Sequence, residues 1–217
     1  LHLCDRRQRQ MCIRDRIIAT SGHRETVDRA LFEKLIDEGS YGVNEAFSEC
    51  DYVFLCAPVS CNAKYLADLK SVIKKDCIIT DVGSTKTDIH QKVIQLDMEE
   101  NFIGGHPMAG SEKTGLNNAK RHLIENAYYI ITPTAKVSND AVEDYRELIA
   151  SFNAIPLILD YREHDYITAA ISHLPHLIAA GLVNLVKHND SDAEYMKTMA
   201  AGGFKDITRL SLIHISE

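Results

Sequence analysis

The sequence lacks a surplus of basic residues. Its 217 residues carry 24 Lys and Arg against 31 Asp and Glu, for a formal net charge of −7 and a pI near 5.8. Nucleic acids and anionic membrane surfaces attract proteins through clusters of positive charge, so this balance argues against either as a partner. No signal peptide and no apolar run approaching a membrane span are evident. We therefore expect a cytoplasmic protein that binds a small molecule.

The sequence also lacks the cysteine spacing of a metal site or a redox pair. A chain of this length can stabilise its core without disulfides, so we expect reduced thiols and no bound metal. Cys56 and Cys77 lie in apolar runs, where free cysteine is most simply a core residue. The six cysteines are Cys4, Cys12, Cys50, Cys56, Cys61 and Cys77.

A third absence concerns nucleotide binding. Dinucleotide-binding folds begin with a strand, a Gly-x-Gly-x-x-Gly turn and a helix, and this chain has no such run. Residues 1–15 are rich in Arg and Gln without a sustained hydrophobic period, and both they and residues 211–217 look like non-native sequence. We therefore interpret the chain as a fragment whose first strand and glycine loop are missing, which predicts weak cofactor binding.

Between these ends, short apolar runs alternate with helical patterns up to residue 160. Such strands, separated by helices, are typical of a mostly parallel sheet covered on both faces. We predict a doubly wound α/β domain over residues 16–160 and a helical domain over 161–210. The predicted strands are 17–20, 52–56, 77–80, 101–103, 127–131 and 155–159, and the predicted helices are 25–36, 63–73, 86–96, 140–152, 163–172, 175–188 and 193–201.

Two loops of this chain fall where doubly wound sheets bind their ligands, beyond the carboxyl ends of the strands. Ala57 and Pro58 follow one predicted strand, and Asp81, Gly83 and Ser84 follow the next. We expect a nucleotide cofactor to bind across these two loops. The alternative is that Pro58 and Gly83 only form turns.

The residues after the first predicted strand bear on the choice between NAD and NADP. An acidic residue there favours NAD by hydrogen-bonding the ribose 2′-hydroxyl, but the chain has Ser21-Gly22-His23-Arg24. Ser21 and Arg24 can accept a 2′-phosphate, so NAD and NADP both stay open. The competing interpretation is that Arg24 lies in the first turn of a solvated helix.

A glycine-rich run around His106 is the most informative stretch. It reads Gly104-Gly105-His106-Pro107-Met108-Ala109-Gly110-Ser111-Glu112-Lys113-Thr114-Gly115, a combination typical of a reaction site, with a polar surface loop as the alternative. This run resembles the signature loop of the prephenate dehydrogenase family. Three further runs agree with that family in order and spacing: Asp-Val-Gly-Ser-Thr-Lys at 81–86, Ser-His-Leu-Pro-His at 172–176 and Gly-Gly-Phe-Lys-Asp-Ile-Thr-Arg at 202–209.

The resemblance covers residues 16–210 and implies a reaction: the NAD(P)-dependent oxidative decarboxylation of prephenate to 4-hydroxyphenylpyruvate in tyrosine biosynthesis. In the family pattern His106 matches the catalytic base that takes the proton of the 4-hydroxyl. Ser84 matches a serine that hydrogen-bonds near this histidine, the substrate hydroxyl and the nicotinamide. The first strand of this chain resembles the family's second strand, whose end meets the adenosine ribose.

The same resemblance implies residues on the substrate side of the site. Arg209 matches the arginine that holds a substrate carboxylate, a task suited to a planar fork with fixed charge. Lys205 lies four residues earlier and shares its helical face. Gly202 is assigned to the same substrate site, and Ser111 and Glu112 look like gate residues beside it, with exposed loop residues as the alternative.

Two histidines around Pro175 are interpreted separately. By resemblance His176 reaches the substrate pocket as a catalytic residue, while His173 is structural. A zinc site that adds His164 and Asp165 competes with this interpretation, but Pro175 disturbs the helix that would aim such ligands.

The resemblance leaves alternatives open. An arogenate dehydrogenase, another hydroxyacid dehydrogenase and a non-catalytic dimerising or nucleotide-sensing fragment are the other candidates. Hydroxyacid dehydrogenases of similar architecture generally use a lysine base, so His106 argues for the first family. The helical region is expected to form a homodimer that continues past Arg209 in the full-length protein.

Overall fold

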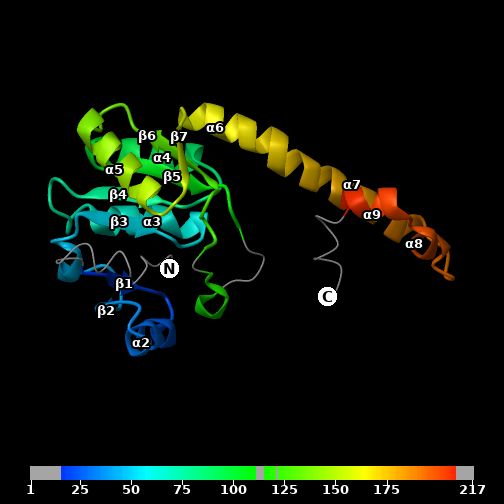
Figure 1. Ribbon diagram of the computed structural model, residues 1–217, viewed down its shortest axis with the longest axis horizontal. Helices are drawn as coiled ribbons and strands as arrows, with labels where there is room; N and C mark the ends of the chain where they lie inside the picture. Colours follow the sequence, from blue (N-terminus) through cyan, green and yellow to red (C-terminus); the bar gives the residue numbers. More distant parts are fainter. Residues whose placement is uncertain (1–15, 111–114, 121, 209–217) are drawn as a thin grey trace. The chain divides into compact units, whose positions relative to one another are not determined.

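The computed structural model describes residues 16–110, 115–120 and 122–208 (Figure 1). It divides into two compact units, Leu1–His164 and Asp165–Glu217, and the boundary lies inside helix α6 (Tyr161–Thr168). All of the described strands belong to the first unit, and the described part of the second unit is helical. The strand ends that carry His106 and Ser84 therefore belong to the first unit.

The first unit begins with a parallel pair of short strands. Strand β1 (Ile18–Thr20) pairs with β2 (Glu38–Ser40), and helix α2 (Arg24–Phe32) connects them. The predicted helix 25–36 ends earlier than expected, and β2 was missed because Glu-Gly-Ser carries no apolar residue that would mark a strand. The helix packs on the pair through a small core of Val27, Ala30 and Ile36.

The second parallel pair lies at the centre of the larger core. Strand β3 (Tyr52–Leu55) pairs with β4 (Ile78–Asp81), and helices α3 (Val59–Leu69) and α4 (Thr87–Gln95) follow them. Strand β3 is apolar throughout and β4 begins with the buried apolar pair Ile78 and Ile79, close to the strands that the sequence predicted at 52–56 and 77–80. The buried core contains Phe47, Val53, Leu55, Leu66, Leu69, Cys77, Ile79, Ile89, Val93, Met98 and Phe102. Burial raises the pKa of the Cys77 thiol to about 12, so this cysteine stays protonated.

The third group of strands adds an antiparallel pairing to a mostly parallel arrangement. Strand β5 (Ile103–Pro107) is antiparallel to β6 (Tyr128–Pro133), which is parallel to β7 (Ile155–Ile158). Helix α5 (Asn139–Ser151) begins where the Ser138 hydroxyl accepts a hydrogen bond from a backbone N–H, a common N-cap. Short 3₁₀ turns complete this part of the chain at η1 (Glu45–Phe47), η2 (Glu99–Asn101) and η3 (Leu116–Asn118).

The strand predicted at 101–103 was placed too early. Strand β5 runs to Pro107, so the first half of the glycine-rich run is strand and not loop. Two glycines permit this because their backbone packs closely on its neighbours: a Cβ at Gly105 would lie 2.6 Å from the carbonyl oxygen of Asp81 and 2.7 Å from the Tyr129 hydroxyl. A Cβ at Gly104 would lie 2.9 Å from a ring nitrogen of His90. These contacts leave no room for a side chain.

The second unit continues the helix that starts with α6. A π-helical turn at Ala169–His173 joins α6 to α7 (Leu174–Asn189), and short helices α8 (Tyr195–Met199) and α9 (Gly202–Thr208) follow. Pro175 was predicted to disturb this helix. The wide π turn immediately before it keeps the helix continuous, because such turns rearrange the backbone hydrogen bonds locally. Helix α9 packs against α7.

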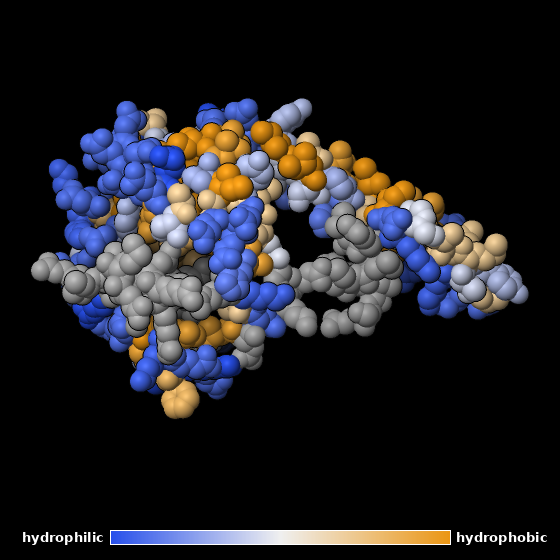
Figure 2. Space-filling view, viewed as in Figure 1, coloured by the Kyte–Doolittle hydropathy of each residue, from blue (hydrophilic) through white to orange (hydrophobic). Residues whose placement is uncertain are grey.

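The long helix corrects one sequence-based prediction. Residues Tyr161–Asn189 are long and apolar enough to cross a membrane by length and composition, although no such run was predicted. Only 11% of the apolar window is buried within the described structure, and Figure 2 shows its apolar residues in orange along the helix. Large apolar side chains that are 51–71% exposed are Ile171, Leu174, Leu177, Ile178 and Leu185. A face of this kind marks an interaction surface.

Replacing Gly105 by Ala should destabilise the first unit. The added Cβ meets a backbone carbonyl that cannot move away without distorting β4, so we expect the free energy of unfolding to fall by about 1–3 kcal/mol. Urea denaturation followed by circular dichroism measures this. The control is Gly22→Ala, whose Cβ would meet no atom within 4 Å. Equal stability of the two variants would contradict the packing argument.

Candidate active site

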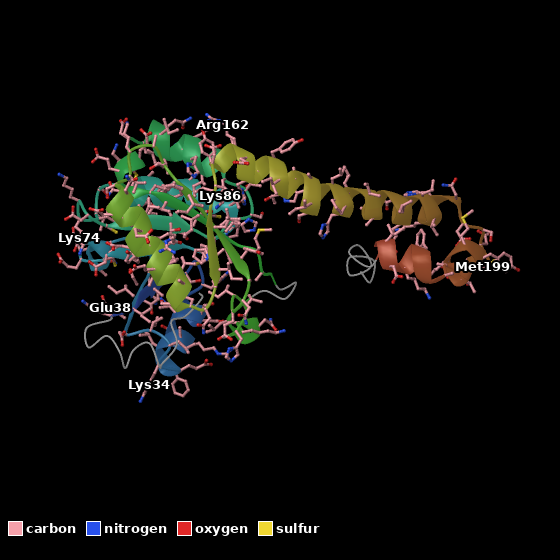
Figure 3. All side chains as sticks on the ribbon, turned by 45° about the horizontal axis from the view of Figure 1, so that its top comes forward. Lys34, Glu38, Lys74, Lys86, Arg162 and Met199 are labelled. Atoms are coloured by element: carbon pink, nitrogen blue, oxygen red, sulfur yellow. The ribbon has the colours of Figure 1, made fainter. Side chains whose placement is uncertain are left out.

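A buried ion pair lies at the carboxyl end of β4. Asp81 is the last residue of this strand and Lys86 precedes helix α4, and their side chains are 1% and 0% exposed. The Lys86 ammonium donates to the Asp81 carboxylate and to the carbonyl of Gly105 at 2.8 Å. Asp81 also accepts from the backbone N–H of Gly83 at 2.9 Å and of Gly105 at 3.3 Å. Figure 3 labels Lys86 inside the unit.

This ion pair fixes the loop after β4 against strand β5. Both charges are removed from water, so each depends on the other and on the backbone groups around it. Asp81 was predicted to contact the cofactor, but its carboxylate faces Lys86 and the backbone inside the protein. Ser84 is exposed in the same loop. The ion pair therefore shapes the loop, and Ser84 is the side chain that this loop presents outward.

His106 lies on the next strand at the same edge of the sheet. A parallel bridge between Ile79 and Phe102 aligns β5 with β4, so the carboxyl ends of both strands point the same way. His106 is the fourth residue of β5 and is partly exposed. The structure thus brings His106 and the loop that carries Ser84 to one edge of the sheet.

A second histidine, His164, contacts the ring of His106 through a hydrogen bond between ring nitrogens. Nδ1 of His106 lies 2.8 Å from Nε2 of His164, and the two rings meet edge to face with centroids 5.1 Å apart. His164 is 1% exposed and comes from helix α6, 58 residues later in the chain. One nitrogen of this pair donates and the other accepts, which sets the tautomer and the ring orientation of His106.

The first turn of α6, which supplies His164 and belongs to the first unit, packs on the rest of that unit. The ring of Tyr161, the first residue of α6, stacks on His90 with centroids 4.3 Å apart and planes 10° from parallel. Nε2 of His90 lies 3.0 Å from the Thr132 hydroxyl on β6. Asp160 accepts hydrogen bonds from the first backbone N–H groups of the helix, which stabilises its start. These contacts explain why His164 reaches His106.

Buried hydroxyl groups support the backbone under the site. The Tyr145 hydroxyl lies 2.8 Å from that of Thr80 and 3.0 Å from that of Tyr129, next to Gly105. Burial raises the pKa of both tyrosines well above the ordinary value, so both hydroxyls stay neutral. A neutral hydroxyl both donates and accepts, so this network satisfies buried polar groups without adding a charge.

The two predicted nucleotide loops lie side by side. The backbone N–H of Val82 donates to the carbonyl of Leu55 at 3.3 Å, which joins the loop after β4 to the end of β3. Ala57 and Pro58 follow β3, and helix α3 starts at the next residue. The side chain of Asn62 in the first turns of α3 is 1% exposed, and neither of its amide atoms has a partner among the described residues. An unsatisfied buried amide next to these loops fits a site that a polar ligand completes.

The third predicted nucleotide segment lies at the end of β1. Ser21 follows this strand, and its hydroxyl oxygen accepts from the backbone N–H of His23 at 3.2 Å. Arg24 begins α2 and lies over the ring of Tyr41, 4.2 Å from its centroid. The structure therefore brings Arg24 to the residues that follow β2, which the sequence did not predict.

Three predicted substrate residues belong to the helical unit. His176 is exposed on α7 and its Nδ1 donates to the carbonyl of Ser172 at 2.8 Å. Gly202 begins α9 and Lys205 is exposed on the same helix. The remaining predicted residues, Ser111, Glu112 and Arg209, lie outside the described residues. Within the described ranges, no group of three His, Cys, Asp or Glu residues has the arrangement of a metal site.

Fold and site together define the class of protein: a nucleotide-binding α/β domain, with a histidine at a strand end, followed by a helical domain. Residues 5–156 match the family model for the nucleotide-binding domain of prephenate dehydrogenase, and residues 160–213 match the model for its dimerization domain. The chain belongs to the prephenate dehydrogenase family. This confirms the predicted Rossmann-like domain followed by a helical domain.

Individual relatives agree with the family match. The chain is 39% identical over 198 residues to a prephenate dehydrogenase of Bacillus subtilis, and 36% identical over 191 residues to one of Lactococcus lactis. These alignments cover 90% and 87% of this chain but 53% and 52% of the relatives, so the chain spans about half the length of the curated relatives it matches.

Solved structures resemble the chain as well. A prephenate dehydrogenase of Aquifex aeolicus, in complex with hydroxyphenyl propionate and NAD+, superposes with a TM-score of 0.84 at 29% identity, covering 93% of this chain and 71% of that one. A Synechocystis arogenate dehydrogenase gives a TM-score of 0.80 at 29% identity, with 90% and 70% covered.

Breaking the buried ion pair should destabilise the protein strongly. Lys86→Met leaves the Asp81 carboxylate buried without its cation, so we expect the free energy of unfolding to fall by about 3–5 kcal/mol. Adding Asp81→Asn removes the orphaned charge and should recover part of this loss. Urea denaturation of both single variants and the double variant measures the coupling.

The matched control is Lys74→Met, which breaks an ion pair with Asp51 at the surface. Its partner carboxylate is 81% exposed, so we expect a change below about 1 kcal/mol. A Lys86→Met variant as stable as Lys74→Met would refute the role of the buried pair.

Proposed function

We propose that the full-length protein containing this chain is an NAD(P)-dependent prephenate dehydrogenase. The observation that carries the proposal is His106, presented at a strand end beside the Ser84 loop and held through Nδ1 by His164. The family match supports the assignment, since the matched model describes a nucleotide-binding domain. The reaction would convert prephenate to 4-hydroxyphenylpyruvate and CO2.

The chemistry requires a base, a hydride acceptor and cations. A bound nicotinamide supplies the hydride acceptor. The proton of the 4-hydroxyl moves to the imidazole of His106 and hydride leaves C4. The electrons of the bond between C1 and its carboxylate then enter the ring as CO2 departs, and His106 returns the proton to the phenolate oxygen of the product. Imidazole suits this task because its ordinary pKa lies close to neutral pH.

Ser84 is proposed to orient the reactants and not to attack them. Its loop is fixed by the ion pair of Asp81 and Lys86, so its exposed hydroxyl can hold the substrate hydroxyl at the nicotinamide end of the cofactor. The loop residues Ala57, Pro58 and Gly83 are proposed to line the cofactor. Gly83 leaves no room for a side chain, because a Cβ there would lie 2.9 Å from an Asp81 carboxylate oxygen and 3.1 Å from a Val59 methyl group.

Cations from the helical domain are proposed to bind the two substrate carboxylates. Arg209 suits this role because a guanidinium pairs with a carboxylate through two parallel hydrogen bonds, and Lys205 adds a second charge. We assign His176 to the substrate pocket, and Gly202, Ser111 and Glu112 to its border. The acidic protein needs such a local positive site to capture a dianion.

A homodimer in the cytoplasm completes the proposal. Helix α7 exposes a row of apolar side chains, and the matched family model describes residues 160–213 as a dimerization domain. Burying this face against a second copy would remove apolar surface from water. The length and composition of the helix are then those of an interface helix.

Arogenate is the second candidate substrate. It differs from prephenate in carrying an amino group in place of the side-chain keto group. The solved arogenate dehydrogenase resembles this chain about as closely as the solved prephenate dehydrogenase does. Assaying both substrates with both cofactors separates the candidates.

Replacing His106 by Ala should abolish most of the activity. Loss of a positioned general base lowers kcat by about 10²- to 10⁴-fold. The full-length protein is assayed with prephenate or arogenate by the absorbance of the reduced nicotinamide. The control is His122→Ala, an exposed histidine paired with Glu125, which should stay active. A His106→Ala variant with normal kcat would exclude His106 as the base.

Replacing His164 tests whether it positions His106. His164→Phe removes the partner of Nδ1, and we expect kcat to fall by about tenfold while the affinity for nucleotide is unchanged. His164→Gln keeps an amide oxygen that can accept from Nδ1 and should restore part of kcat. If His164→Phe and His164→Gln have the same kcat, or if both lose nucleotide binding, His164 only supports the fold.

A further inference from the structure

The end of β1 carries the features of a phosphate site in place of a ribose acceptor. In nucleotide-binding α/β domains, a carboxylate at such a strand end accepts hydrogen bonds from the ribose hydroxyls of NAD, whereas an arginine accommodates the 2′-phosphate of NADP. None of the four residues from Ser21 to Arg24 has a carboxylate. The sequence left this choice open because one arginine in a helical first turn can simply be solvated.

The structure shows that Arg24 is held in place. Its guanidinium lies 4.2 Å from the centroid of the Tyr41 ring, close enough for a cation–π interaction. The Tyr41 hydroxyl in turn donates to Asp28 at 2.6 Å, which fixes the ring on helix α2. The backbone N–H of Gly42 donates to the Thr20 hydroxyl at 2.9 Å. The bond between Gly42 and Thr20 holds the segment after β2 at the end of β1. The Tyr41 ring in that segment then holds the guanidinium of Arg24 at the same place.

Arg24 also differs from its basic neighbours in its partners. Arg16 pairs with Glu38, and Arg29 pairs with Glu33 at 2.6 Å. Arg24 has no ion pair with a carboxylate among the described residues, and its described contact is the face of an aromatic ring. Stacking leaves the N–H groups at the edge of the guanidinium able to donate to an anion. Arg24 is therefore positioned by the Tyr41 ring, and the nearby Asp28 carboxylate accepts a hydrogen bond from the Tyr41 hydroxyl.

Ser21 supplies a second group of the right kind. Its hydroxyl oxygen accepts from the backbone N–H of His23, so the hydroxyl proton can be donated to a ligand. A phosphate accepts hydrogen bonds and carries negative charge, which fits a hydroxyl donor beside an arginine. A ribose 2′-hydroxyl needs an acceptor here, and Ser21 with Arg24 offers mainly donors.

From this geometry we propose that the protein selects NADP over NAD through Arg24 and Ser21, with Tyr41 positioning Arg24. The inference rests on the proposed function, because it concerns the cofactor of that same site. It assigns Arg24 and Ser21 to the 2′-phosphate and Tyr41 to the placement of the guanidinium.

Direct binding of NADPH and NADH to the full-length protein tests the inference without relying on turnover. The fluorescence of the nicotinamide itself is the signal, and it is titrated at fixed ionic strength. We expect NADPH to bind at least about tenfold more tightly than NADH, as a charge-assisted hydrogen bond implies. Adenosine 2′,5′-bisphosphate should compete better than adenosine 5′-monophosphate.

Substitutions assign the preference to individual side chains. Arg24→Ala should lose the preference for NADPH and leave NADH binding unchanged, whereas Arg29→Ala, on the same helix, should change neither. Tyr41→Phe keeps the ring under Arg24 and should keep the preference, while Tyr41→Leu should weaken it. Ser21→Asp introduces the missing carboxylate and should shift the preference toward NADH.

The outcomes separate two failures. Equal binding of both nucleotides, tighter binding of NADH, or an Arg24→Ala variant that still prefers NADPH would overturn this inference and leave the proposed function intact. Binding of neither nucleotide by a folded protein would overturn the proposed function, and the inference with it. A preference for NADPH that is lost in Arg24→Ala, weakened in Tyr41→Leu and shifted toward NADH in Ser21→Asp would support the inference.

Discussion

The buried ion pair between Asp81 and Lys86 is the constraint on which the site depends. Two opposite charges without water are stable only while both are paired and hydrogen-bonded, so the groups around them are held to one geometry. Those groups are the backbone of Gly83 in the loop and of Gly105 in β5. The pair therefore couples the loop that presents Ser84 to the strand that presents His106. Without this coupling, the positions of Ser84 and His106 would depend separately on the loop after β4 and on strand β5.

The glycines of β5 and the pair of His106 and His164 also fix the position of the His106 side chain. Gly104 and Gly105 let β5 approach β4, β6 and the tyrosine hydroxyls more closely than any other residue allows. On the far side of the strand, His164 fixes the ring of His106 from helix α6. Placing a reactive side chain on a rigid strand and orienting it with a buried partner limits its motion. The run 104–107 is thus both part of the scaffold and the proposed reaction site.

The sequence predicted the parts of this structure that have a local pattern. Strands β3 and β4 were predictable because apolar residues make up all of β3 and the first half of β4, and His106 because glycines and a proline surround it. Strand β2 was missed because Glu-Gly-Ser has no apolar residue. The partnership of His164 with His106 was missed because it joins residues 58 positions apart, and the sequence offered His164 only as an unlikely metal ligand. Arg24 was ambiguous until Tyr41, which also comes from another element, was found beneath it.

The π turn at Ala169–His173 sets the phase of the helix that follows it. A π turn absorbs one more residue than an α turn, so a helical wheel drawn without a break through Tyr161–Asn189 misplaces every residue after His173 by about 100°. Loss of one residue from the turn would return it to α geometry, and the apolar residues of α7 would keep their present direction relative to α6. Loss of one residue within α7 would instead rotate the remaining apolar row away from its present face.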